Sequence, residues 1–155
     1  MNRRKEDKDR GTEEILVART VDPRIAERIH RLLLGSPVAR ALGIEMHALE
    51  ADRAVLGLPF KPENVTVEDI VHGGVVAALI DVAGIAAALS GASFETLHGS
   101  ATSALSISYL APARSVSLRA EAIVLRRGRR QVVIDVSVSA GPVAVAKALL
   151  TAALF

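Results

Sequence analysis

The sequence predicts an α+β fold in which an antiparallel sheet of about six strands wraps one long central helix. Residues 73–89 (GGVVAALIDVAGIAAAL) are apolar on every side apart from Asp81, and alanine, a strong helix former, dominates them. Six other segments are predicted as strands, and the clearest of them alternate apolar and polar residues. A helix without a polar face needs cover over most of its circumference, and one curved sheet would supply it.

Two shorter helices are predicted before the sheet. Asp22 followed by Pro23 is typical of an N-cap and a first helical residue, and apolar residues then recur at helical spacing for about three turns. Ser36 and Pro37 repeat this start signal for a second helix that ends near Gly43.

The predicted strands span about 44–51 and 54–60 before the central helix, and 105–109, 116–124, 131–139 and 143–155 after it. Residues 61–71 hold one proline, one asparagine and three acids, and are predicted as a loop. Short polar loops separate the last four strands, which favours antiparallel hairpins.

A length of 155 residues fits a single domain. Residues 1–14 carry five basic and five acidic side chains without an apolar run, so we interpret them as a disordered charged tail and assign 15–155 to the domain. This segment does not resemble a secretory signal, and we expect a cytoplasmic protein.

The composition excludes several classes of function. The chain has no cysteine, which excludes a disulfide scaffold, a thiol nucleophile, a cysteine zinc site and an iron–sulfur cluster. Three phenylalanines, one tyrosine, no tryptophan and a net charge of +2 argue against a nucleic-acid groove. The histidines lack metal-site spacing, so we expect no metal and no cofactor.

The central helix is not expected to cross a membrane. A span needs about 20 apolar residues, and a central aspartate costs about 2.5–3.5 kcal/mol there. This run has 17 residues with Asp81 at its centre, so we expect a helix that is buried in protein.

His72, Gly73 and Gly74 stand where a loop enters this helix. The first helical N–H groups have no partner within the helix, the helix dipole adds positive potential, and glycine lets a substrate approach closely. These are the parts of an anion site or an oxyanion hole. The alternative is that the two glycines only permit a tight turn.

Asp81 suggests a general base, because an unpaired carboxylate in an apolar helix is costly to keep. A structural role would need a buried Arg, Lys or hydrogen-bond donor beside it. Asp81 lies eight residues from Gly73, about 12 Å along a helix, so one chain cannot bring both groups to the same atom. If they share a site, two helices pass antiparallel in a two-fold dimer with two composite sites.

The stretch DIVHGGVVAALIDVAGIAAAL resembles the signature of the PaaI-like branch of hotdog-fold acyl-CoA thioesterases, within the 4-hydroxybenzoyl-CoA thioesterase-like superfamily. An acid follows the histidine by nine positions, as His72 and Asp81 do here. The segment TSALSISYLAPAR, the RRGRR turn and the alternating final strands are similar to the same family, so the resemblance covers about 42–155.

The resemblance implies a hotdog fold, homodimers and, in many relatives, tetramers built as dimers of dimers. It implies hydrolysis of an acyl-CoA thioester, with coenzyme A as part of the substrate. The amide of Gly73 would polarise the carbonyl, and Asp81 of the partner subunit would act as nucleophile or general base. His72 would orient the site.

Three positions depart from the family pattern or extend it. The family commonly has Asn or Gln six residues before the histidine, where this chain has Thr66, with Asn64 two residues earlier. It often has Gly three before the histidine, where this chain has Asp69. Some relatives place a Ser or Thr at the position of Thr102, but strand parity predicts that Thr102 points away from the apolar face.

A cluster of arginines is the candidate for the phosphates of coenzyme A, since arginine pairs with phosphate in a bidentate way. The candidates flank Gly128 in a predicted hairpin turn, with one weaker candidate upstream: Arg126, Arg127, Arg129, Arg130 and Arg114. The alternative is a solvated turn whose charges discourage edge pairing.

These observations favour an enzyme that hydrolyses an acyl-CoA thioester. A non-catalytic acyl-CoA-binding module is the alternative, because the usual amide is missing at Thr66. A hotdog hydratase is a weaker alternative, because its close His–Asp pair is not found. The sequence does not identify the acyl group, and it does not separate dimer from tetramer.

Overall fold

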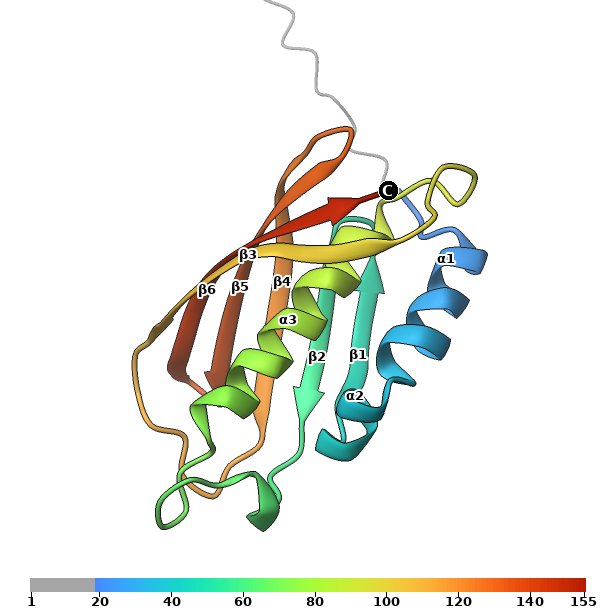
Figure 1. Ribbon diagram of the computed structural model, residues 1–155. Helices are drawn as coiled ribbons and strands as arrows, with labels where there is room; N and C mark the ends of the chain where they lie inside the picture. The colour runs from blue at the N-terminus through green and yellow to red at the C-terminus, as the bar shows by residue number, and fades with distance from the viewer. Residues whose placement is uncertain (1–18) are drawn as a thin grey trace, which may run out of the picture.

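A computed structural model describes residues 19–155 and consists of one antiparallel sheet curved around one long helix (Figure 1). The segment 1–14, which we expect to be a charged tail, lies outside the described residues.

The sheet contains six strands: β1 (Glu45–Glu50), β2 (Arg53–Leu58), β3 (Ser100–Tyr109), β4 (Leu118–Arg127), β5 (Gln131–Ala140) and β6 (Val143–Leu154). Their order is β1-β2-β4-β5-β6-β3, and every neighbouring pair is antiparallel. The predicted α+β class and the hotdog architecture are confirmed. Strand β4 extends beyond its predicted end because a bulge between Val124 and Arg126 interrupts the alternation.

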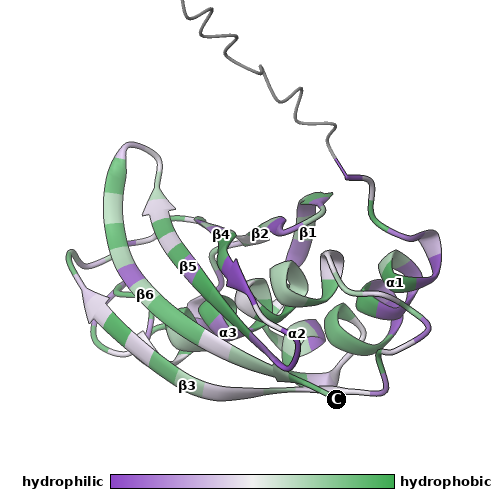
Figure 2. Cartoon of the chain, turned by 90° about the horizontal axis from the view of Figure 1, so that it is seen from above, coloured by the Kyte–Doolittle hydropathy of each residue, from purple (hydrophilic) through white to green (hydrophobic). Residues whose placement is uncertain are grey.

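The central helix α3 (Gly73–Ser90) begins and ends within one residue of its predicted bounds. Its cover comes from apolar side chains on the inward faces of the strands. These alternate with polar side chains along much of β5, whereas β6 is apolar over most of its length (Figure 2). Small residues bring the helix close to the sheet: a Cβ at Gly84 would lie 2.7 Å from Leu150 Cδ1. By length and hydropathy α3 could cross a bilayer, but 67% of it is buried inside the fold.

One face of α3 is only partly covered by residues 19–155. Gly74 is exposed, and Ala77, Ala78 and Asp81 are half-buried. These positions follow the i, i+3, i+4, i+7 spacing of one helix face. The helix is thus buried over most of its surface, as predicted, and this stripe of small side chains is only partly covered by the described residues of one chain.

The N-terminal helices lie beside β1 and α3 (Figure 1). Helix α1 (Pro23–Arg28) continues into the π-type turns of η1 (Ile29–Leu34), and α2 (Pro37–Leu42) follows. The predicted caps are present, because the Asp22 and Ser36 side chains accept backbone N–H groups of the first turns. Gly43 ends α2 with a φ of 74°, a conformation that favours glycine.

Candidate active site

The loop before α3 fixes where the helix begins. The loop includes a short 3₁₀ turn, η2 (Pro62–Asn64), and the backbone N–H of His72 donates to the Asn64 carbonyl at 2.8 Å. The N–H of Val71 donates to the Ala113 carbonyl at 2.9 Å, which ties the same loop to the segment after β3. These bonds hold the first helical amides in place.

The backbone N–H groups of Gly73 and Gly74 differ in their hydrogen bonding. The N–H of Gly74 donates to Nδ1 of His72 at 2.8 Å, so His72 is the N-cap of α3. Within residues 19–155, the N–H of Gly73 has no acceptor. Of the two predicted donors, Gly73 is therefore the one whose amide is available to a developing oxyanion.

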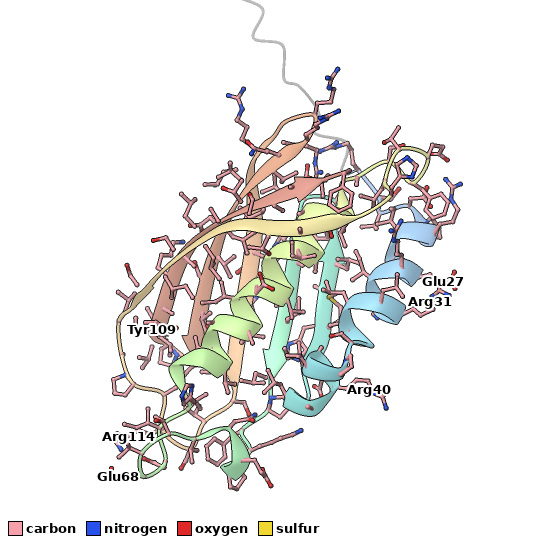
Figure 3. All side chains as sticks on the ribbon, viewed as in Figure 1. Glu27, Arg31, Arg40, Glu68, Tyr109 and Arg114 are labelled. Atoms are coloured by element: carbon pink, nitrogen blue, oxygen red, sulfur yellow. The ribbon has the colours of Figure 1, made fainter. Side chains whose placement is uncertain are left out.

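Tyr109 closes over Gly73, a contact that the sequence did not predict. Its hydroxyl donates to the Gly73 carbonyl at 2.8 Å, and a Cβ at Gly73 would lie 3.6 Å from its ring. In Figure 3 Tyr109 lies at the end of the molecule where α3 begins. The available signal was that the chain's single tyrosine ends the apolar face of its strand.

Asp81 is half-buried and is held by Thr102. The Thr102 hydroxyl donates to an Asp81 carboxylate oxygen, with 2.5 Å between Oγ1 and Oδ1. No Lys, Arg or His forms an ion pair with Asp81 in the part of the chain that the structure describes. The carboxylate therefore has a hydrogen-bond donor but no cation, which leaves its second oxygen without a partner among the same residues.

The expected orientation of Thr102 was wrong. Counting back from Leu105 predicts that Thr102 faces outward, yet the register of β3 with β6 shifts between Thr102 and Ala104. A bulge at Ser103 inserts one residue, which returns Thr102 to the inward face. Such a bulge re-aims a side chain without leaving any local mark in the sequence.

A cavity of about 330 Å³ opens beside Gly73. Its walls come from the loop before α3, the first turn of α3 and the segment that follows β3, and they include Thr66, Val76 and Tyr109. Asn64 does not line this cavity. It is 8% exposed, and its Nδ2 is buried without a partner among the described residues.

Arg114 is engaged by acids of the loop before α3. Its Nη1 donates to Glu68 at 2.9 Å and to Asp69 at 2.8 Å, and the Ser115 hydroxyl donates to Asp69 at 3.0 Å. Hydrogen bonding to Arg114 lowers the pKa of Asp69 below its ordinary value. Figure 3 shows Glu68 and Arg114 side by side beyond the start of α3. This pairing occupies the weaker arginine candidate and neutralises the acid that replaces the family's glycine.

The four arginines of the turn differ in what they contact. Arg127 donates to Asp52 at 2.6 Å and to the Ala88 carbonyl at 2.8 Å, so it joins the end of α3 to the β1–β2 turn. Arg129 and Arg130 are exposed and line a second cavity of about 630 Å³ beyond the C-terminal end of α3. Arg126 is exposed and does not line it.

Metal ligands do not gather in this fold. Across residues 19–155, no group of three His, Asp or Glu side chains could hold a metal ion. The chemical groups at hand are thus a cation-free carboxylate with a hydroxyl beside it, an available amide at a helix start, and two cavities at opposite ends of that helix.

Comparison with known proteins identifies the family to which this arrangement belongs. The model of the thioesterase superfamily matches residues 68–147, about half of the chain. A curated protein of Saccharolobus solfataricus, named "Putative esterase SSO1253", is 30% identical over 109 residues, which cover 70% of this chain and 71% of that protein.

Solved structures share the fold. The PaaI protein of the phenylacetic acid degradation operon of Escherichia coli superimposes with a TM-score of 0.77 at 22% identity, covering 88% of this chain and 96% of that one. A hypothetical thioesterase of Streptococcus pneumoniae, solved with coenzyme A, gives a TM-score of 0.70 at 20% identity, covering 83% and 95%.

Proposed function

This chain belongs to the thioesterase superfamily, and from that premise we propose that it hydrolyses an acyl-CoA thioester to a free acid and CoA. The observation that carries the proposal is Asp81, a half-buried carboxylate with a hydroxyl donor but no cation among the described residues. A module that only binds acyl-CoA would gain nothing from such a group. The combination of Asp81 with the available Gly73 amide supports hydrolysis.

In the proposed reaction, the Gly73 N–H donates to the thioester carbonyl oxygen as negative charge develops there, and the dipole of α3 favours that charge. As general base, Asp81 takes a proton from water while the water oxygen attacks the carbonyl carbon; the C–S bond then breaks and CoA leaves as its thiolate. As nucleophile, its carboxylate oxygen attacks the carbonyl carbon and the C–S bond breaks, which forms a mixed anhydride and releases CoA as its thiolate. Water then hydrolyses the anhydride to the free acid and restores the Asp81 carboxylate.

The two groups require a second subunit. Along α3 they stand about 12 Å apart, too far to act on one carbonyl within one chain. The two edges of the sheet differ: β1 has six residues, among them the charged Glu45 and Glu50, whereas β3 has ten residues and no charged residue. Unprotected edges of this kind pair with another strand. We therefore propose a homodimer that forms along β3, with tetramers as dimers of such dimers.

This pairing would also place Asp81 of one subunit near Gly73 of the other. Thr102 lies near the start of β3 and Tyr109 at its end, so two antiparallel copies of β3 set Thr102 of one beside Tyr109 of the other. Asp81 bonds Thr102, and Gly73 bonds Tyr109. Each composite site would then hold one carboxylate and one available amide.

The phosphates of CoA are proposed to bind at the second cavity. Arg129 and Arg130 line it and form no ion pair with the side chains of residues 19–155, and guanidinium groups suit phosphate. The cavity adjoins Gly91, beyond the end of α3, about 15 Å along the helix axis from Asp81. The pantetheine arm separates the nucleotide from the thioester by a span of this order. CoA thioesters belong to the cell interior, so we propose a cytoplasmic location.

The decisive experiment measures thiol release from a panel of acyl-CoA esters with a thiol-reactive dye. Release that Asp81→Asn abolishes would support hydrolysis. The second candidate, an acyl-CoA-binding module, is favoured by one observation: Thr66 lines the cavity, at a position where the family resemblance implies an amide. Tight binding of acyl-CoA without thiol release from any ester would favour that module and refute the hydrolase.

A further inference from the structure

We propose that the cavity beside Gly73 receives the acyl group, and that its chemistry selects uncharged acyl groups of modest size over acyl groups that end in a carboxylate. This inference rests on the proposed hydrolase function and adds the substrate class. In this proposal the residues that line the cavity determine which acyl groups are accepted, while Gly73 and Asp81 carry out the reaction at the carbonyl.

The lining is almost entirely apolar. Val76, Ala113 and Val145 are buried in its walls, and Ile70 and Ala111 are half-buried. The lining contains no charged side chain and only two hydroxyls, those of Thr66 and Tyr109. The Tyr109 hydroxyl already donates to Gly73, so a buried carboxylate would find few donors.

The position of the cavity assigns it to the acyl side of the thioester. It adjoins the first turn of α3, whereas the arginine-lined cavity adjoins the last turn. A thioester held at the Gly73 amide has its acyl group on one side of the carbonyl and its pantetheine arm on the other. Because arginines suit the nucleotide end, the apolar cavity is left for the acyl end.

Charge at the rim adds to this selection. Glu68 and Asp69 share the single guanidinium of Arg114, which leaves one net negative charge beside the cavity. An acyl group that carries its own carboxylate would meet like charge as well as an apolar wall, and both disfavour it.

The same ion pairs fix the shape of the wall. They join the loop before α3 to the segment after β3, and each of these segments contains a non-glycine residue with positive φ: Glu68 at 53° and Ser115 at 47°. Such conformations persist where surrounding bonds hold them. The cavity is thereby bounded by two segments tied to each other, and its size is set by Ile70 on one and Ala111 on the other.

The test compares acyl-CoA esters of graded length and charge on the full chain. We expect kcat/KM for succinyl-CoA to be at least about 100-fold lower than for butyryl-CoA, because the cavity would desolvate an unpaired carboxylate. Ile70→Ala should raise the ratio of octanoyl- to butyryl-CoA hydrolysis by about 10-fold, and Ala111→Leu should lower it by about 10-fold. Opposite shifts from the two variants would locate the acyl group between them.

Matched controls are Ile123→Ala and Ala153→Leu, which make the same changes on the outer face of the sheet and should leave the length profile unchanged. Equal rates for succinyl- and butyryl-CoA would overturn the proposal without any variant. The proposal would also be overturned if neither cavity variant changed the dependence of kcat/KM on acyl length while both variants had the Tm of the wild type. If no ester releases thiol, the hydrolase proposal fails, and the cavity proposal is judged by the Kd values of the same esters, which should follow the same order.

Discussion

Asp81→Asn separates catalysis from structure at the centre of α3. Asparagine keeps the volume of aspartate and still offers an oxygen to the Thr102 hydroxyl, which bonds the carboxylate at 2.5 Å. It can neither take a proton from water nor attack a carbonyl at neutral pH. The change therefore removes the proposed chemistry and leaves the hydrogen bond in place.

The two expected effects differ in size. Loss of general-base catalysis costs about 10²–10⁴-fold in kcat, and loss of a nucleophile can cost more. For stability, a charged acceptor is replaced by a neutral one, which loses about 1 kcal/mol, while the relief of desolvating a half-buried carboxylate acts in the opposite direction. We expect a net change within about 1 kcal/mol, which is about 2–4 °C in Tm for a chain of this size.

The assay follows thiol release against acyl-CoA concentration, beside a thermal melt of the same preparation. Asp135→Asn is the matched control, since Asp135 is a carboxylate on the outer face of β5 that pairs with Lys147. A well-folded Asp81→Asn protein with full activity would refute the mechanism. A loss of several kcal/mol in stability, with activity that tracks the folded fraction, would instead assign Asp81 a structural role.

Four further predictions address binding, assembly, packing and pH. Arg129→Ala combined with Arg130→Ala should raise KM for CoA esters and leave kcat nearly unchanged, since phosphate contacts remote from the carbonyl add uniform binding. Ser106→Lys on β3 should yield monomers by light scattering and abolish activity, because it places charge on an edge that is otherwise uncharged. Arg127→Ala should lower the free energy of unfolding by about 1–3 kcal/mol, because it leaves the Ala88 carbonyl without its side-chain donor and removes one of the two arginines that bond Asp52, the other being Arg19. The pKa of Asp69 in the folded state lies below its ordinary value, so its ion pair with Arg114 stabilises the cavity wall at every pH above the ordinary carboxyl range. We expect acyl-length selectivity to be lost only when the pH falls through that lowered pKa.

Each of these predictions has a result that contradicts it. The KM of a truncated thioester without the nucleotide should not change when Arg129 and Arg130 are replaced. If its KM rises as much as that of the full CoA ester, the arginines do not contact phosphate. An active Ser106→Lys monomer would end the composite-site model. An unchanged melt for Arg127→Ala would assign no stabilising role to its contacts, and selectivity lost near neutral pH would exclude the Asp69 ion pair as its cause.

The elements of this fold were predictable because their signals are local. A helix that is apolar on all sides, alternating strands, and the caps at Asp22 and Ser36 each lie within a few consecutive residues. Boundaries shifted where pairing broke the alternation, as at the bulge near Arg126 that lengthens β4. The wrapping of the sheet around the helix followed from the lack of a polar face on that helix, and the family resemblance identified this arrangement as a hotdog fold.

The pairing of side chains was not predictable in the same way. Arg114 meets Asp69 across 45 residues and Arg127 meets Asp52 across 75, and nothing near either arginine indicates these partners. The four arginines of the turn therefore looked equivalent as phosphate ligands, with Arg114 as a weaker candidate. The structure distinguishes them by what else they bond, and strand register decides the orientation of Thr102 in the same manner.

The surfaces that a single chain leaves uncovered lie next to its catalytic candidate. Asp81 belongs to the uncovered face of α3 and bonds Thr102, which belongs to the unprotected edge β3. In the proposed dimer, pairing along this edge would also cover that helix face, so the free energy that stabilises the dimer and the geometry that completes the site would have one source. For this reason stability and activity should depend on protein concentration together, and a variant that weakens the edge cannot spare the chemistry.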